Sequence, residues 1–472
     1  MHKGLWLLWL SISLCTVAWA QQSKDITGKW YGVTKSYYGD KQRLTVVLEK
    51  ERDGYKGELR NPDYNDEAIT LDHVIYRQDT LLLRVDTIKF AYTGVWNEAS
   101  KQFQGIFTWN GQQGEFNLSR REIRQSDVYK RPQEPKPPYP YHTDEVKFTN
   151  EHDHVSLAGT FTRPAEWGRY PVVVLLNGSG PQDRNDEMAG HKTFLVLADF
   201  LARNGIASLR FDDRGVGASG GVYEKSNIYD FAGDANAAIA YLKTRKDVDP
   251  YTVGLLGHSE GAIVAQIAAA NNKSIAFVVS MAGPGITGRQ LVDQKVIMDG
   301  RMAGESDAEI KARVESLKPY WDALASDTNY VVAATRAKSA LRDIYRASPE
   351  EVKKQVSEET FVNDIHFDRE LSSILLYKPL DYLKQIKCPF MAINGTRDMQ
   401  VEATTNLNAI ERALRENGNM LVTIRKFDGL NHLFQRCKTC TVGEYGDLEQ
   451  TIDPLVPEFI AHWILQLPPR AR

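Results

Sequence analysis

The stretch VGLLGHSEGAIVAQIA, residues 253–268, decides the fold of this chain. It joins a short apolar run to the pentapeptide GHSEG (257–261) and then to an alanine-rich segment with helical spacing. A G-x-S-x-G pentapeptide between a strand and a helix is typical of a nucleophile elbow, a tight turn that exposes a serine hydroxyl above a sheet. The flanking glycines let strand and helix approach without Cβ clashes, and the turn holds the serine in a strained conformation. We therefore predict that Ser259 is the nucleophile of an acyl-transfer reaction.

A second pentapeptide, GASGG at residues 217–221, fits the same pattern in a different context. The strand predicted before it (207–211) ends well short of the first glycine, and no alanine-rich helix follows. We interpret Ser219 as part of a Gly/Ser loop and not as a nucleophile.

Apolar strands alternate with helical patterns on both sides of the elbow. The predicted strands are 145–149, 155–161, 172–176, 253–256, 277–279 and 390–393, with helices such as 194–204 and 229–242 between them. This alternation predicts a parallel α/β sheet covered on both faces. Residues 286–375 are charged and helix-prone, with helices expected at 307–317 and 349–360, and they predict a helical insertion that caps the site.

The region before residue 120 has a different sequence pattern, with short runs of alternating apolar and polar residues and no helical spacing. The candidate strands are 29–34, 43–49, 54–59, 69–76, 81–85, 90–96, 102–109 and 114–118. The dipeptides DG (53–54) and NG (110–111) separate neighbouring runs and are strong hairpin signals. We predict a small all-β domain, closed into a barrel of lipocalin-like outline.

These textures divide the chain into four parts. Residues 1–20 have the basic start, apolar run and A-x-A site of a signal peptide. The apolar run is short for a spanning helix, and lipidation at Cys15 is disfavoured by the bulky Leu14 before it. Residues 21–125 form the all-β domain, 126–142 a linker containing RPQEPKPPYP (131–140), and 143–472 the catalytic domain.

Composition and cysteine usage indicate an exported globular protein. Hydrophobic residues make up 42% and charged residues 25%, and the net charge of −3 argues against nucleic-acid binding. Signal cleavage would leave Cys388 and the C-x-x-C pair Cys437/Cys440, which is either a local disulfide or two free thiols. Two of four N-x-[ST] sequons, at Asn177 and Asn394, fall in loops of the expected catalytic site, where a glycan would block access. This favours a bacterial host and a periplasmic or secreted protein without stable membrane insertion.

A serine nucleophile needs an imidazole to take its proton and a carboxylate to orient the imidazole. In the α/β-hydrolase order both follow the serine, each on a loop after a late strand. Asp398 ends the loop NGTRD (394–398) after one predicted strand, and His432 lies in FDGLNHLF (427–434) after the strand 421–426. The alternatives for the acid are Asp428 and Glu402. We interpret His258 as packing within the elbow.

Two backbone N–H groups must stabilise the oxyanion of the tetrahedral intermediate. One is expected from Glu260, the residue after the nucleophile. The other is expected from Ser179 in the glycine-rich loop NGSGP (177–181) after the strand 172–176. The charged run DRNDE (183–187) beyond it reads as a solvated loop without a role. Nothing in these motifs implies a cofactor or a metal.

With these motifs in place, the chain resembles the exported bacterial serine carboxylesterases of the α/β-hydrolase superfamily that carry an N-terminal β-rich domain. The run RFDDRGVG (210–217) and the closing segment PEFIAHWI (457–464) extend the resemblance. It implies a Ser259–His432–Asp398 triad that hydrolyses small-molecule carboxylic esters with short acyl chains, without a cofactor. Two departures are the start of the oxyanion loop, where family members have histidine and this chain has Asn177, and the Cys437/Cys440 pair.

Two other functions remain as alternatives. Prolyl-type exopeptidases share the fold and the triad order, but usually carry a much larger β-propeller ahead of the catalytic domain. A ligand-binding protein with an inert hydrolase domain is disfavoured because all three triad residues are present in their expected context.

Overall fold

The computed structural model describes residues 24–36, 39–109, 112–364 and 368–468. The predicted signal peptide and the NG dipeptide of 110–111 lie outside these ranges. The chain divides into two compact units: one contains the described residues up to Thr34 together with Gln42–Arg124, and the other contains Lys35–Lys41 and the chain from Gln125 onwards.

The first unit consists of two antiparallel sheets. One sheet pairs its strands in the order β1 (Gly28–Lys35), β2 (Lys41–Glu51), β3 (Gly54–Arg60) and β4 (Ile69–Thr70). The other has the order β5 (His73–Arg77), β6 (Thr80–Val85), β7 (Phe90–Asn97), β8 (Gln102–Trp109) and β9 (Gln112–Glu115). The DG dipeptide joins β2 to β3 as predicted, with Glu51 opposite Gly54.

The single strand predicted at 69–76 is two strands, because the chain crosses there from one sheet to the other. The N–H of Leu71 donates to the carbonyl of Gly57 in the first sheet, at 2.9 Å. The N–H of the next residue, Asp72, donates to Arg84 in the second sheet, also at 2.9 Å. The all-β character of this region is confirmed, as two sheets that share an aromatic-rich core around Trp30, Phe103 and Phe116.

The second unit is built on an eight-stranded sheet. Its order is β10 (His142–Asn150), β11 (Val155–Arg163), β15 (Ala207–Phe211), β12 (Tyr170–Leu176), β16 (Val248–His258), β17 (Val278–Met281), β18 (Phe390–Gly395) and β19 (Val422–Phe427). The six strands from β15 to β19 run parallel, and the hairpin β10–β11 adds an antiparallel edge. A short hairpin, β13 (Glu187–Met188) and β14 (His191–Lys192), stands apart from this sheet.

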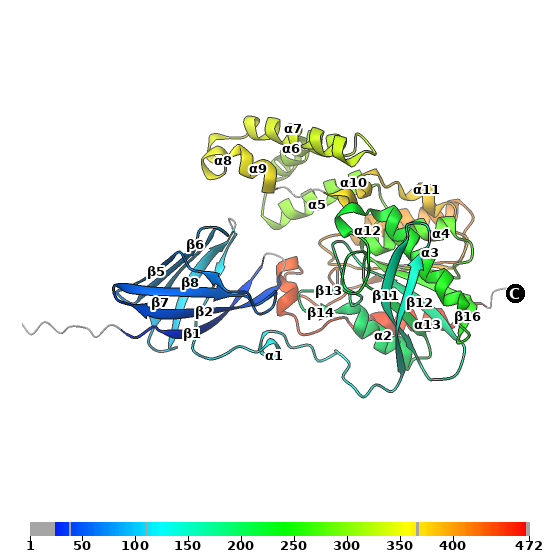
Figure 1. Cartoon of the computed structure of the whole chain (residues 1–472). Helices are drawn as coiled ribbons and strands as arrows, with labels where there is room; N and C mark the ends of the chain where they lie inside the picture. Colours follow the sequence, from blue (N-terminus) through cyan, green and yellow to red (C-terminus); the bar gives the residue numbers. More distant parts are fainter. Residues whose placement is uncertain (1–23, 37–38, 110–111, 365–367, 469–472) are drawn as a thin grey trace, which may run out of the picture. The chain divides into compact units, whose positions relative to one another are not determined.

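Helices cover both faces of the sheet (Figure 1). The side chains of β12 alternate between the hydrophobic clusters on the two faces. Val172 and Val174 belong to one hydrophobic cluster with residues of α3 (Ile228–Thr244), α4 (Glu260–Asn271), α11 (Pro379–Leu383) and α12 (Ala403–Glu416). Val173 and Leu175 belong to the cluster on the other face, with residues of α2 (Thr193–Arg203) and α13 (Leu455–Leu465). The remaining short helices are α1 (Gln125–Val128), η1 (Tyr223–Lys225) and η2 (Val442–Asp447). The predicted α/β-hydrolase architecture is therefore confirmed.

The predicted helical insertion is present between β17 and β18. It comprises α5 (Gly288–Met302), α6 (Asp307–Leu324), α7 (Tyr330–Ala347), α8 (Glu350–Gln355), α9 (Glu358–Asp364) and α10 (Arg369–Leu376), with a small core of its own around Tyr320 and Leu341. The helix predicted at 349–360 is two short helices, because Val356 adopts an extended conformation and ends the first. None of the helices in the described ranges is both long enough and apolar enough to cross a membrane.

Candidate active site

Ser259 occupies the turn between β16 and α4, at the carboxyl edge of the parallel strands. Its backbone has φ 55° and ψ −116°, a conformation that costs on the order of 1–3 kcal/mol for a residue with a side chain. The Ser259 N–H donates to the carbonyl of Met281 at the end of β17, at 2.8 Å. The surrounding sheet thus holds the strained turn that the sequence predicts.

The two glycines of the pentapeptide are required by close backbone contacts. A Cβ on Gly257 would collide with the carbonyl group of Gly261. A Cβ on Gly261 would collide with the carbonyl oxygen of Leu176 on the neighbouring strand β12. The pattern G-x-S-x-G therefore reflects the closeness of β16, α4 and β12 at this point.

His432 and Asp398 meet on the loops after β19 and β18. The Nδ1 atom of His432 lies 2.7 Å from Oδ2 of Asp398, and both residues are almost completely buried. The other carboxylate oxygen of Asp398 accepts the N–H groups of Gln400 and Val401, at 2.8 and 2.9 Å. With Asp398 as acceptor, the proton of the neutral imidazole resides on Nδ1, so Nε2 is left as the base.

The two other carboxylates considered for this role have different partners. Glu402 accepts the N–H groups of Thr404 and Thr405 and caps α12. Asp428 is exposed and accepts the hydroxyl of Thr396. Neither pairs with His432.

His258 connects the elbow to the His432 loop. Its ring centroid lies 4.9 Å from that of His432, and its Nε2 lies 3.1 Å from the His432 carbonyl oxygen. Its Nδ1 lies 3.1 Å from a carboxylate oxygen of Asp186, and both residues are buried. Burial opposes protonation of His258, but the Asp186 carboxylate outweighs it and the pKa of His258 is raised. His258 does pack within the elbow, as predicted, and it does so as part of a buried charge pair.

The interpretation of 183–187 as a solvated loop is wrong at Asp186. This residue is 4% exposed, and its other oxygen accepts the Gly178 N–H at 3.0 Å. Asp186 is buried because it pairs with His258, which is distant in the sequence. No local pattern in the run 183–187 distinguishes Asp186 from the other acids beside it.

The loop predicted to supply an oxyanion donor is held by carboxylates at alternate N–H groups. The N–H of Gly178 donates to Asp186, that of Gly180 to Glu370 at 3.2 Å, and that of Gln182 to Asp213 at 3.0 Å. The side-chain amide of Asn177, which stands where family members have histidine, donates to Asp213 at 3.0 Å. Ser179 is exposed and lies between the first two anchored N–H groups.

Glu260, which follows the nucleophile, directs its side chain into a cluster of acidic groups beside this loop. Burial raises the pKa of Glu260 well above its usual range, and the nearby carboxyls of Glu370 and Asp213 add to the effect. Burial also raises the pKa of Asp213 well above its usual range. The phenol of Tyr223 donates to Glu370, and Asp213, Tyr223 and Glu260 line a small cavity next to the loop. Burial thus favours the protonated forms of Glu260 and Asp213.

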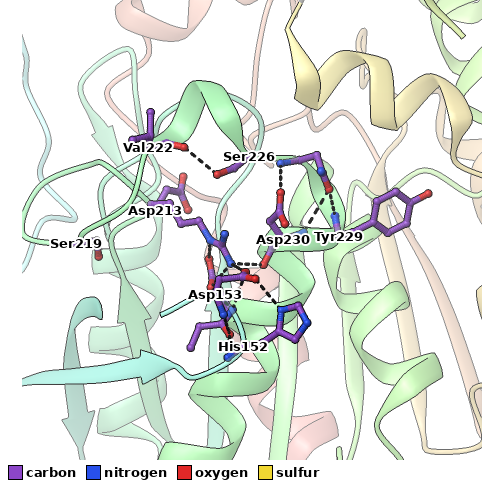
Figure 2. Close-up of polar contacts among 12 residues, drawn as sticks. His152, Asp153, Asp213, Ser219, Val222, Ser226, Tyr229 and Asp230 are labelled. Atoms are coloured by element: carbon purple, nitrogen blue, oxygen red, sulfur yellow. Dashed lines mark hydrogen bonds and ion pairs between the residues drawn. The ribbon is translucent and has the colours of Figure 1, made fainter. Parts of the chain in front are cut away.

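Ser219 belongs to a structural loop, as the sequence indicates. Its hydroxyl donates to the carbonyl of Asp212 at 2.8 Å and accepts the Ala158 N–H at 2.9 Å. Arg214, earlier in the same loop, contacts Asp234 and Asp153. Asp153 also contacts His152 (Figure 2). The two hydrogen bonds of the Ser219 hydroxyl connect this loop to β11.

Cys437 and Cys440 form a disulfide in the segment that follows His432. The carboxylate of Glu444 accepts the N–H groups of Lys438, Thr439 and Cys440 within this small loop. Arg397, the residue before Asp398, donates to the carbonyl of Lys438 at 3.0 Å. The disulfide loop therefore contacts the loop that carries the acid.

The described residues contain no cluster of histidine, cysteine and carboxylate side chains suited to a metal ion. A groove of about 820 Å³ lined by Phe277, Pro389 and Leu421 lies at the amino ends of the strands. Ser259 is at the opposite, carboxyl edge, so this groove does not serve the site.

Comparisons with known proteins place the chain in a family. The model of the S15 family, described as X-Pro dipeptidyl-peptidase, matches residues 153–424. Esterase EstD of Thermotoga maritima is 28% identical over 316 residues, which are 66% of this chain and 66% of that esterase. The uncharacterized protein Rv2307c of Mycobacterium tuberculosis is 32% identical over 114 residues, 24% of this chain and 36% of that protein. The chain thus matches just under two thirds of the esterase and about a third of the mycobacterial protein.

Among solved structures, the esterase Pf2001 of Pyrococcus furiosus covers 72% of this chain and 96% of its own, with 19% identity and a TM-score of 0.41.

Proposed function

Because the chain belongs to the S15 family of X-Pro dipeptidyl-peptidases, we propose that it is a serine hydrolase. We further propose that it cleaves carboxylic esters with short acyl chains through an acyl-enzyme on Ser259. The observation that carries this proposal is the buried His432–Asp398 pair, at 2.7 Å. His432 contacts His258, the residue before a serine in a strained strand-to-helix turn. The relationship to an esterase from Thermotoga maritima favours an ester as the substrate.

In the proposed reaction, Nε2 of His432 takes the proton of the Ser259 hydroxyl while Oγ attacks the ester carbonyl carbon. Asp398 accepts Nδ1–H and stabilises the imidazolium that forms. Collapse of the tetrahedral intermediate breaks the bond to the alcohol, which leaves with the proton from His432. Water, deprotonated in the same way, then releases the carboxylic acid and restores Ser259.

We assign the oxyanion to the backbone N–H groups of Glu260 and Ser179. An N–H in the first turn of a helix has no acceptor within the helix, and Glu260 begins α4. The Ser179 N–H lies in the loop after β12, between the anchored N–H groups of Gly178 and Gly180. Donors held in this way gain strength from being oriented before charge develops.

The experiment is hydrolysis of p-nitrophenyl esters, from acetate to decanoate, by the wild type, Ser259→Ala and Ser219→Ala. We expect rapid turnover of the short chains by the wild type and by Ser219→Ala, and loss of at least about 10³-fold in Ser259→Ala. The Ser219 variant is the matched control, because it removes the serine of the other G-x-S-x-G pentapeptide. Absence of turnover for every ester by folded wild type would contradict the proposal.

The second candidate is peptide cleavage, and the match to a family described as X-Pro dipeptidyl-peptidase favours it. Hydrolysis of Ala-Pro-p-nitroanilide distinguishes the two, because an esterase site turns over the activated ester far faster than the anilide. A kcat/KM for the anilide above that for p-nitrophenyl acetate, abolished in Ser259→Ala, would favour the peptidase.

We also propose that residues 1–20 direct export and are removed. N-terminal sequencing of protein recovered from the periplasm or medium of a bacterial host tests this, with Gln21 as the expected first residue.

A further inference from the structure

A buried carboxylate of the helical insertion, that of Glu370, contacts the oxyanion loop. This residue lies in the first turn of α10 and is 6% exposed. One carboxylate oxygen accepts the Gly180 N–H at 3.2 Å, and the other accepts the phenol of Tyr223. The contact spans 190 positions of the sequence and joins the insertion to the loop after β12.

The three acids that anchor this loop come from different places. Asp186 follows the loop directly, and Asp213 follows β15 of the same sheet. Glu370 alone comes from the insertion. Gly180, with φ 86°, adopts a conformation that favours glycine, so its N–H direction is set by a backbone that other residues rarely adopt. Without Glu370, the Ser179–Gly180 peptide keeps an anchor on one side only, at Gly178.

We propose that Glu370 is a positioning residue, through which the helical insertion holds the Ser179 N–H in place for the oxyanion. This inference rests on the proposed serine hydrolase reaction. It assigns to the insertion a direct effect on the rate of the chemical step.

Groups from three other elements face Glu370. Tyr223 from η1 donates to it, and the carboxyls of Glu260 from α4 and Asp213 from the β15 loop are its acidic neighbours. Burial raises the pKa of Glu260 and that of Asp213 well above the usual range of a carboxyl group. An oxygen of Glu370 accepts the Gly180 N–H.

The test compares wild type, Glu370→Ala, Glu370→Gln and Glu359→Ala in hydrolysis of p-nitrophenyl acetate. We expect Glu370→Ala to lower kcat about 10- to 100-fold with KM within about threefold, since a displaced donor weakens the transition state and not substrate binding. Glu370→Gln keeps an oxygen that accepts the Gly180 N–H, so it should retain at least about a third of wild-type kcat. Glu359, an exposed acid of α9 in the same insertion, is the matched control and should match the wild type.

Three results would overturn the inference: an unchanged kcat in Glu370→Ala, a Glu370→Gln variant as slow as Glu370→Ala, or an effect confined to KM. Circular dichroism checks the fold of each variant. Tyr223→Phe provides a second route, because it removes the hydroxyl donated to Glu370 and keeps the ring stacked on Phe231 at 5.4 Å. Its kcat should fall about 3- to 10-fold, and an unchanged kcat would also count against the inference.

Labelling of Ser259 by a rhodamine-linked fluorophosphonate separates this inference from the proposed function. Here Oγ bonds to phosphorus, fluoride leaves, and the oxyanion hole assists without any particular ester. Labelling slowed in Glu370→Ala in proportion to kcat supports the inference, and equal labelling of the two proteins overturns it alone. No labelling of Ser259 in the wild type would overturn both.

Discussion

The imidazole of His432 and the carboxylate of Asp398 form a buried pair, with 2.7 Å between Nδ1 and Oδ2. Because Asp398 also accepts two backbone N–H groups, its orientation is set by the loop and not by His432 alone. The pair is therefore preorganised, and a proton on Nδ1 of His432 leaves Nε2 to act as the base in the proposed reaction.

Asp398→Asn tests this arrangement. An asparagine amide facing Nδ1 favours the other tautomer, so we expect kcat for the ester substrate to fall about 10³- to 10⁴-fold. The matched control is Asp428→Asn, which removes an exposed acid that accepts from Thr396, and its kcat should stay within about threefold of wild type. Equal losses in the two variants would show that Asp398 has no special role.

Asp186→Asn tests the buried pair beneath the elbow. Asp186 has φ 51°, a conformation that asparagine tolerates, so the substitution removes the charge and preserves the backbone. We expect the free energy of unfolding to fall by about 2–4 kcal/mol, because His258 loses the carboxylate that compensates its burial. Urea denaturation measures this, with the exposed Glu166→Gln as control. A change below about 0.5 kcal/mol would mean that the pair contributes little.

From the lowered pKa of His191 we predict how the free energy of unfolding changes with pH. Burial, aided by the charge of Arg131, lowers the pKa of His191 from 6.5 to about 4. Between these values the unfolded chain binds a proton that the folded chain does not, so stability falls as the pH drops from 6.5 towards 4, by at most about 3 kcal/mol. In His191→Gln this part of the curve of unfolding free energy against pH should flatten. The exposed His152→Gln should leave its slope unchanged.

The elbow, the acid and the histidine can be predicted from the sequence because each stands in a local pattern. Ser259, Asp398 and His432 each follow an apolar strand on a loop, and the parallel sheet brings the ends of those strands to one edge. Asp186 and Glu370 are different. Each becomes part of the site only through a partner distant in sequence, His258 or Gly180, and neither stands in a pattern that distinguishes it from an exposed acid.

The same reasoning applies to the first unit. Residues 69–76 alternate like one strand, and only the hydrogen bonds of Leu71 and Asp72 to different sheets divide them.

For Cys437 and Cys440, in the second unit, the spacing allows a disulfide or two thiols, and the folded loop brings the two sulfur atoms together.

Removal of the Cys437–Cys440 disulfide should lower the melting temperature modestly. It should have a larger effect on the loop that carries Asp398, and through it on kcat. Closing so short a loop is worth about 2 kcal/mol or less in the chain-entropy model, so Cys437→Ser with Cys440→Ser should lower the melting temperature only moderately. Loss of the Lys438 carbonyl as a partner for Arg397 should lower kcat by up to about tenfold. Cys388→Ser, which changes the cysteine outside the disulfide, is the control. A double variant with the melting temperature and kcat of the control would show that the bond is dispensable.

The insertion leaves the sheet after β17 and returns to it at β18, and these two strands are direct neighbours, paired from Val278–Phe390 to Met281–Ile393. Its helices can therefore lengthen, shorten or be exchanged during evolution without altering the register of any strand. A descendant with a new insertion would keep its sheet and its elbow, and would need to re-create the contact at Gly180 among those that the insertion makes with the rest of the unit. Substrate range and catalytic machinery can in this way diverge at different speeds within one gene.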